Sequence, residues 1–240
     1  MLESALLILI TFLAALVGTI SGFGISSLMI PVVLLFYPLP TVLLFVGIIH
    51  LFGDVWKIIF FRRGADWKLI AAFGIPGVLL SYLGASIFLT VSPELLKRIL
   101  GGFLILYTLY LFLKRHWRIP RKGATAVAGG ALSGFFAGIF GIGGAVRGAF
   151  LAAYNLPKET YIFTAGLIAL FIDVTRITRY LTGGAGLGGF PARLLIVLVP
   201  VSLLGAYLAK RAVDRVPQKY FRLVIAVFLG LLGLKFIIFP

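Results

Sequence analysis

Gly18–Pro31 (GTISGFGISSLMIP) and Gly134–Gly148 (GFFAGIFGIGGAVRG) are glycine-rich stretches that interrupt apolar runs at matching places in the two halves of a 240-residue chain. The runs around them, residues 2–37 and 124–154, are too long for one crossing, since about 36 helical residues extend about 54 Å against a bilayer core of about 30 Å. Glycine lets the backbone turn sharply and lets other groups approach closely. We therefore predict a helical hairpin in each half, with its tip inside the protein, where the freed backbone groups find partners.

The composition is that of a membrane protein. Hydrophobic residues make up 61% of the chain and charged residues only 12%, and the mean hydropathy of +1.14 exceeds what a soluble core of this length hides. The N-terminal segment lacks the basic region and cleavage site of a signal peptide, so we interpret it as retained structure. The chain is predicted to be an all-α integral membrane protein.

The apolar segments fall into two similar sets of four. They cover residues 2–37, 39–61, 67–90, 94–113, 124–154, 159–182, 190–212 and 217–239. Leu51–Lys57 aligns with Leu170–Arg176, and Gly84-Ala85 aligns with Gly205-Ala206. We predict two repeats, residues 1–113 and 124–240, each a glycine-broken hairpin followed by three transmembrane helices. A basic linker, residues 114–123, joins them.

The basic residues predict the orientation of the repeats. No Lys or Arg precedes Lys57, whereas the linker alone contains five; the linker should therefore be cytoplasmic and the N-terminus extracellular. The asymmetry is largest if each hairpin returns to its starting side, which makes the repeats inverted. The same loops explain most of the net charge of +15, and their scattered charges argue against nucleic-acid binding.

Ionisable residues inside the apolar spans are costly and usually face the protein interior. They are His50, Asp54, Lys57, Arg147, Asp173, Arg176 and Arg179. Asp54 with Lys57, and Asp173 with Arg176, have the i, i+3 spacing that puts both members of a pair on one helical face. Two interpretations remain open: structural ion pairs that hold the bundle together, and positive charges of Lys57 and Arg176 that act on a substrate.

Arg147 is the strongest candidate for an anion ligand. It follows the tip glycines Gly141, Gly143 and Gly144 and has no acidic residue within one helical turn. A helix that starts at these glycines offers free N–H groups and a positive dipole end to an anion. The alternative is an arginine that caps carbonyl groups of the other hairpin.

The first hairpin offers hydroxyl groups in place of that charge. Gly24 is followed by Ser26 and Ser27, which add uncharged donors at the matching place. The i, i+4 glycine pairs Gly18–Gly22 and Gly134–Gly138 are expected to allow close helix packing at the hairpins and need no role in substrate binding.

His50 lies four residues before Asp54, on the same helical face, so a proton relay that also involves Asp173 is chemically possible. A histidine that only makes a hydrogen bond is the alternative. The aligned residue in the second half is Ala169, which makes any coupling role asymmetric.

Enzyme motifs are not found in the sequence. Gly141-Ile142-Gly143 lacks the third glycine of a dinucleotide-binding motif, and no GxSxG, HExxH or P-loop pattern occurs. With no cysteine and two widely separated histidines, no metal site and no cofactor are expected.

The hairpin motifs resemble a known family. FGIGGA at 140–145 and GFGISS at 22–27, with Pro31 and a Leu-Pro pair after each hairpin, look like the glycine-rich signature of the TauE/SafE sulfite exporter family, over essentially the whole chain. The resemblance implies a permease of the prokaryotic plasma membrane for sulfite, sulfonates or related small anions. Two departures are Ser26-Ser27 in place of glycines, and Arg147 where bulky apolar residues are common.

The sequence thus predicts a secondary transporter, and more narrowly an exporter, for a small sulfur-containing anion bound between the two hairpin tips at mid-membrane. Its partners would be the anion and the lipid bilayer, and a homo-oligomer is compatible with the pattern. The alternatives are an anion channel and a membrane assembly subunit that transports nothing.

Overall fold

The computed structural model describes residues 2–21, 24–62, 65–113, 122–188, 190, 192–212 and 218–240. Over these ranges the chain is entirely helical. The helices are α1 (Leu2–Ser21), α2 (Ile25–Val33), α3 (Leu39–Phe60), α4 (Trp67–Phe88), α5 (Pro93–Leu113), α6 (Gly123–Phe140), α7 (Gly143–Ala153), α8 (Lys158–Thr182), α9 (Leu194–Ala212) and α10 (Gln218–Ile238). The predicted all-α architecture is confirmed, and each of the two long apolar runs is broken into a long and a short helix.

The first break lies at Gly24, which has a φ of 80°. Its amide donates to the carbonyl of Gly18, 3.2 Å away, and a Cβ on Gly18 would lie 2.7 Å from the Gly24 backbone. Only glycine fits both this left-handed conformation and this close approach. The short helix α2 that follows is buried at all but one of its nine positions, so the tip of this hairpin is inside the protein.

The second break lies at Gly141, which has a φ of 72° and ends α6. The Gly141 amide donates to the Ala137 carbonyl at 2.9 Å, which is the αL type of helix end, and the Ile142 amide donates to the Phe136 carbonyl at 3.3 Å. Helix α7 then starts at Gly143. Gly24 and Gly141 are each followed by isoleucine, so the repeated sequence places a left-handed glycine at the same point of each hairpin.

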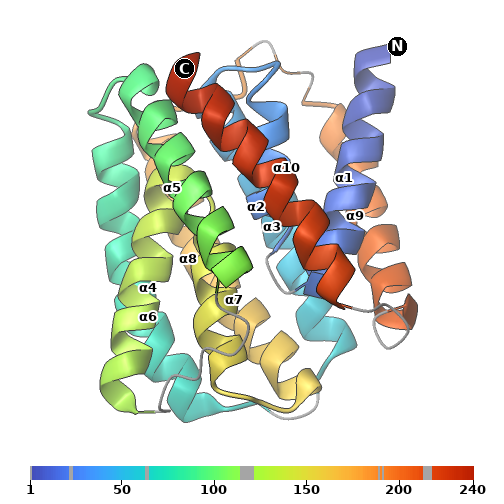
Figure 1. Cartoon of the computed structure of the whole chain (residues 1–240), viewed down its shortest axis with the longest axis vertical. Helices are drawn as coiled ribbons and strands as arrows, with labels where there is room; N and C mark the ends of the chain where they lie inside the picture. The colour runs from blue at the N-terminus through green and yellow to red at the C-terminus, as the bar shows by residue number, and fades with distance from the viewer. Residues whose placement is uncertain are drawn as a thin grey trace.

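The helix contacts of one half recur in the other. Helix α4 packs on α6, as α9 packs on α1, and α4 packs on α8, as α9 packs on α3. The contacts of α3 with α8 and of α5 with α10 each join a helix to its own counterpart in the other half. In Figure 1, α5 and α10 lie in front of the central helices α2, α3, α7 and α8. The same view shows α1 beginning at the end of the bundle where the chain terminates, whereas α6 begins at the opposite end.

The tightest helix contact is between α4 and α6. A Cβ on Gly134 would lie 1.9 Å from the Gly77 carbonyl oxygen, and one on Gly138 would lie 2.1 Å from that of Ser81. The expectation that Gly134 and Gly138 allow close helix packing at the hairpin is confirmed, and the helix that approaches them is α4. Gly22, of the other pair, lies outside the described residues.

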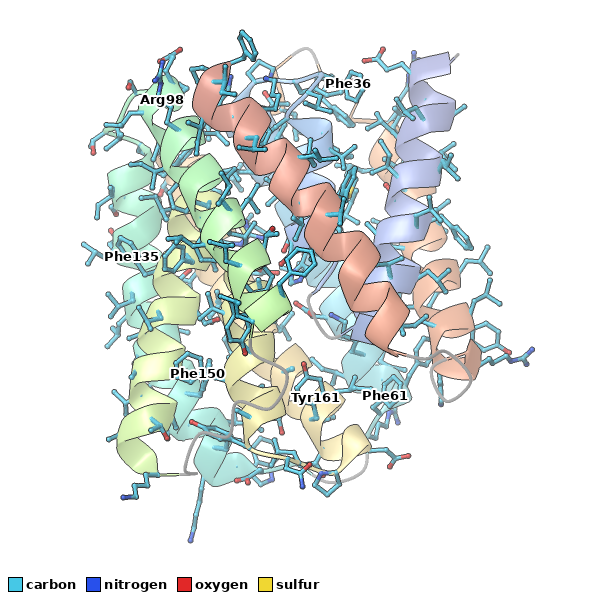
Figure 2. The ribbon with its side chains drawn as sticks, in the orientation of Figure 1. Phe36, Phe61, Arg98, Phe135, Phe150 and Tyr161 are labelled. Atoms are coloured by element: carbon cyan, nitrogen blue, oxygen red, sulfur yellow. The ribbon has the colours of Figure 1, made fainter. Side chains whose placement is uncertain are left out.

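The outer surface is apolar along the long helices. Ile75, Leu79 and Ile196 are 63%, 63% and 77% exposed. Among the residues that the structure describes, six helices are long and apolar enough to cross a membrane: α1, α3, α4, α6, α8 and α9. Figure 2 places Phe36 and Arg98 at one end of the bundle and Phe61 and Tyr161 toward the other. An apolar girdle of this kind is the surface that a multi-pass membrane protein presents to lipid.

Candidate functional site

The centre of the molecule is the contact between α3 and α8, where each helix carries a buried ion pair. The ammonium of Lys57 lies 2.9 Å from the Asp54 carboxylate, and Nε of Arg176 lies 2.7 Å from that of Asp173. Both pairs have the i, i+3 spacing read in the sequence, so their formation follows from helix geometry.

His50 joins the two pairs. Its Nδ1 lies 2.5 Å from Oδ2 of Asp173 on α8 and 3.1 Å from Oδ2 of Asp54 on its own helix. The in-helix contact with Asp54 agrees with the predicted relay, while the shorter contact crosses to the other half of the chain. The result is a network of five side chains, His50, Asp54, Lys57, Asp173 and Arg176, which we term the central network.

All five members are shielded from solvent. Lys57 is the most exposed at 8%, and Asp54 and Arg176 are at 0%. A buried ion is stable only when it is paired and hydrogen-bonded. The two aspartates satisfy this for the two cations, which makes the network neutral when His50 is neutral.

Three polar atoms of the network have no hydrogen-bond partner within the described part of the chain: Nε2 of His50, Nη2 of Arg176 and Oδ2 of Asp54, the last of which lies 3.1 Å from Nδ1 of His50. A Cβ built on Gly24 would lie 2.7 Å from His50 Nε2, and one built on Gly141 would lie 3.4 Å from Nη1 of Arg176. The histidine therefore faces the tip glycine of the first hairpin, and the arginine faces that of the second.

The predicted hairpin residues are also buried. Ser26 and Ser27 lie in the first turn of α2, at 1% and 2% exposure, and Arg147 lies on α7 at 4%. Helix α7 contacts α2, so the two tips meet. Gly143 and Gly144 open α7, and the carbonyl of Gly143 accepts a hydrogen bond from Ser133 at 2.9 Å.

Arg147 differs from the other buried cations because no described acidic group pairs with it. Among the described residues, the fully buried charges are three cations, Lys57, Arg147 and Arg176, and two carboxylates, Asp54 and Asp173. The core thus carries one excess positive charge. Arg179, the remaining intramembrane arginine in the sequence, turns away to α4, where its Nε donates to Ser86 at 2.8 Å.

His50, Asp54 and Asp173 also form a set of ligand atoms within 4.8 Å of one another, a spacing that can hold a metal ion. The sequence did not anticipate this cluster, because the second aspartate comes from the other half. Both carboxylates already neutralise a cation, Lys57 or Arg176. The donor set is therefore charge-balanced without a metal.

Sequence inspection missed three residues that shape the network. Gly47 and Gly166 leave room for Arg176 and Lys57, and the Tyr180 hydroxyl donates to the Gly138 carbonyl at 2.5 Å. Extending the aligned segment four residues back from Leu51 and Leu170 pairs Gly47 with Gly166, which is the signal that would have found them. The Tyr180 contact had no such signal.

The fold and its buried polar centre define a multi-pass membrane transporter. A family model described as sulfite exporter TauE/SafE matches residues 7–236, and the chain belongs to this family. A probable membrane transporter protein of Methanocaldococcus jannaschii is 26% identical over 259 aligned positions, which cover 95% of this chain and 93% of that relative.

Proposed function

We propose that this protein is a carrier for a small sulfur-containing oxyanion, such as sulfite or an organosulfonate, bound between the two hairpin tips. The observation that carries the proposal is the excess positive charge of the core. Arg147 is buried without a described counter-ion, and an unpaired cation inside a membrane protein is strongly destabilised unless an anion neutralises it.

The surroundings of that charge suit an oxyanion. Nη2 of Arg176 is an unused donor, and guanidinium groups bind planar or tetrahedral oxyanions through several hydrogen bonds. The starts of α2 and α7 add backbone N–H groups and positive dipole ends, and Ser26 and Ser27 add hydroxyl groups there. Lys57 and Asp54 balance each other, so we assign them to the scaffold of the site.

The sulfur chemistry of the substrate is proposed from the family description, sulfite exporter TauE/SafE. An exporter gains from an inside-negative membrane potential, because moving one negative charge outward across 100 mV contributes about 2.3 kcal/mol. Export from the cytoplasm of a prokaryote is therefore the proposed direction.

Alternating access is the proposed mechanism. The equivalent helix contacts of the two halves and the opposite starting ends of α1 and α6 (Figure 1) support an inverted repeat, in which rocking of one half against the other opens the site to each side in turn. The burial of every proposed ligand side chain supports a carrier over an open channel. The cytoplasmic linker and extracellular N-terminus are part of this proposal.

The test is a thermal-stability panel on the purified protein with sulfite, sulfate, thiosulfate, sulfoacetate, acetate and chloride at constant ionic strength. A bound anion stabilises the folded state by about 2.7 kcal/mol at 100 times its dissociation constant. We expect selective stabilisation by a sulfur oxyanion that is lost in Arg147→Ala and kept in Arg179→Ala. Arg179 is the matched control because it lies on α8 but bonds to α4.

Two results would contradict the proposal. A folded protein that no anion stabilises, and that co-purifies with another membrane protein, would indicate an assembly subunit. Single-channel conductance in a planar bilayer would indicate a channel.

A further inference from the structure

The contacts of His50 determine which of its ring nitrogens carries hydrogen. Nδ1 lies 2.5 Å from Asp173 and 3.1 Å from Asp54, and both aspartates are ion-paired carboxylates, which only accept hydrogen bonds. Nδ1 therefore carries hydrogen. In a neutral ring Nε2 is then a bare lone pair, and Nε2 is the buried, unpartnered atom that faces Gly24 at the first tip.

A lone pair at this point repels an anion, whereas an N–H at the same atom attracts it. Both aspartates contact the ring at Nδ1, so Nε2 is the position left for a second proton. His50 is thus placed to add a positive charge and a donor at the tip by taking up one proton at Nε2.

The charged or titratable groups of the helices that contact α3 set the electrostatic surroundings of this proton. Helix α3 itself contributes Asp54 and Lys57, and α2 has none. Helix α8 carries Asp173, which contacts the ring, and elsewhere along its length Lys158, Glu159, Tyr161, Arg176, Arg179 and Tyr180. On α9 the groups are Tyr207, Lys210 and Arg211, and the Lys210 ammonium lies at the far end of α3, 3.2 Å from the Phe60 carbonyl. Arg147 on α7 is the one unbalanced buried charge near the tips.

The net charge of the core determines which anions bind together with a proton. With neutral His50 the core has a charge of one positive unit, from Arg147, and a monovalent anion neutralises it. A divalent anion leaves one negative unit, which is costly inside the membrane. Protonation of His50 restores neutrality.

We propose that His50 binds one proton at Nε2 together with each divalent oxyanion, so that the carrier moves a dianion and a proton as a pair. This proposal rests on the proposed anion site. The proton comes from a hydronium ion on the side to which the site is open: an O–H bond of the hydronium breaks, a water molecule is left and the Nε2–H bond forms. On the other side Nε2 returns the proton to water as the anion leaves. Monovalent anions bind without it.

The test measures binding of thiosulfate, a dianion, and methanesulfonate, a monoanion, neither of which titrates near neutral pH. The purified protein is titrated with each probe between about pH 6 and pH 8.5, the range in which histidine changes charge, and an indicator dye in weak buffer reports proton uptake. His50→Asn keeps a nitrogen donor toward the aspartates but cannot titrate. His116→Asn removes the other histidine of the chain and is the matched control.

We expect thiosulfate to take up about one proton and, where His50 is neutral in the free protein, to lose about tenfold in affinity per pH unit. Methanesulfonate affinity should be independent of pH. His50→Asn should abolish the pH dependence for thiosulfate, and His116→Asn should leave it unchanged. In His116→Asn only His50 remains, so its imidazole NMR signal must also shift toward the protonated form when thiosulfate binds, which tests the proposal even if His50→Asn does not fold.

Thiosulfate binding without proton uptake would overturn this inference and leave the anion site standing. A requirement for Na⁺ in place of the proton would also overturn it, and would assign His50, Asp54 and Asp173 to a sodium ion. If neither probe binds at any pH, the inference and the proposed function fall together.

Discussion

Gly47 and Gly166 lie at corresponding positions of α3 and α8, and each faces the buried cation of the other helix. A Cβ on Gly47 would lie 3.2 Å from both terminal nitrogens of Arg176, and one on Gly166 would lie 3.3 Å from Cβ of Lys57. Each glycine precedes the aspartate of its own helix by seven residues. Each half therefore leaves space at the helix crossing for the cation of the other half, while each cation pairs with the aspartate of its own helix.

Gly47→Ala should impair anion binding more than folding. The added methyl group displaces the Arg176 guanidinium, whose Nη2 is an unused donor, by a few tenths of an ångström. Folding should suffer little, because alanine itself favours the helix over glycine by about 1 kcal/mol. Small displacements of a binding group cost up to about a hundredfold in function. We expect thiosulfate affinity to fall by about tenfold with little change in melting temperature, measured by titration and thermal unfolding in the same detergent.

Gly102→Ala is the matched control for that substitution. A Cβ on Gly102, in α5, would meet nothing within 4 Å, so the variant gains helix propensity without touching the site. Equal affinity losses in Gly47→Ala and Gly102→Ala would exclude a specific effect on Arg176.

Gly134→Ala should unfold the protein instead. Its Cβ would lie 1.9 Å from the backbone oxygen of Gly77, and a backbone atom cannot rotate away, so α6 must separate from α4. Overpacking of this kind costs about 3 kcal/mol. We expect loss of the monodisperse peak in size-exclusion chromatography. Gly74→Ala is the control: Gly74 also lies on α4, but its added Cβ would be 3.9 Å from the nearest atom, so this variant should elute normally. Normal elution of both variants would refute the tight contact between α4 and α6.

The hairpins could be predicted because their cause is local. A run too long for one crossing, with glycine in its middle, has few physical solutions in a membrane, and the structure breaks both runs at Gly24 and Gly141. The i, i+3 ion pairs are local in the same sense, since helix periodicity alone brings Asp54 to Lys57.

The rest of the site depends on which helices meet. The shortest contact of His50 is with Asp173, 123 residues away in sequence, and no periodicity within α3 encodes it. The partner of Gly134 could likewise not be named from the sequence, because an i, i+4 glycine pair shows that a helix is approached closely but not by which one.

The folded protein should lose stability at high pH because of Tyr37. Its hydroxyl donates to the Glu3 carboxylate and its ring packs edge-on against Phe190, with centroids 5.2 Å apart. Burial, and then the hydrogen bond and negative charge of Glu3, raise the pKa of Tyr37 from 10.0 to about 12. The folded state thus holds this proton more tightly than the unfolded state, so the contribution is complete below about pH 10 and is lost as the pH rises through about 12.

Between these pH values the melting temperature of the unaltered protein should therefore fall more steeply with pH than that of Tyr37→Phe. Tyr82→Phe removes a tyrosine that is 56% exposed and is the control. Parallel declines in all three proteins would mean that the Glu3 contact does not form in solution.

Variants of the Asp54–Lys57 ion pair distinguish a structural role of the pair from a role in anion binding. Asp54→Asn leaves the Lys57 ammonium buried without its counter-ion, and breaking a buried pair in this way costs about 3–5 kcal/mol. The double variant Asp54→Asn with Lys57→Met removes both charges, which is often nearly neutral for stability, and keeps a side-chain oxygen near His50.

Because the pair is balanced, its removal leaves the excess charge of the core unchanged. We expect the double variant to melt close to the unaltered protein and to keep its thiosulfate affinity within about threefold, since the removed charges nearly cancel at the anion. Arg147→Met, which removes the unbalanced charge, should fold and lose binding. If the double variant folds but binds no thiosulfate, the Lys57 charge acts directly on the anion, and the buried pair belongs to the substrate site instead of the scaffold.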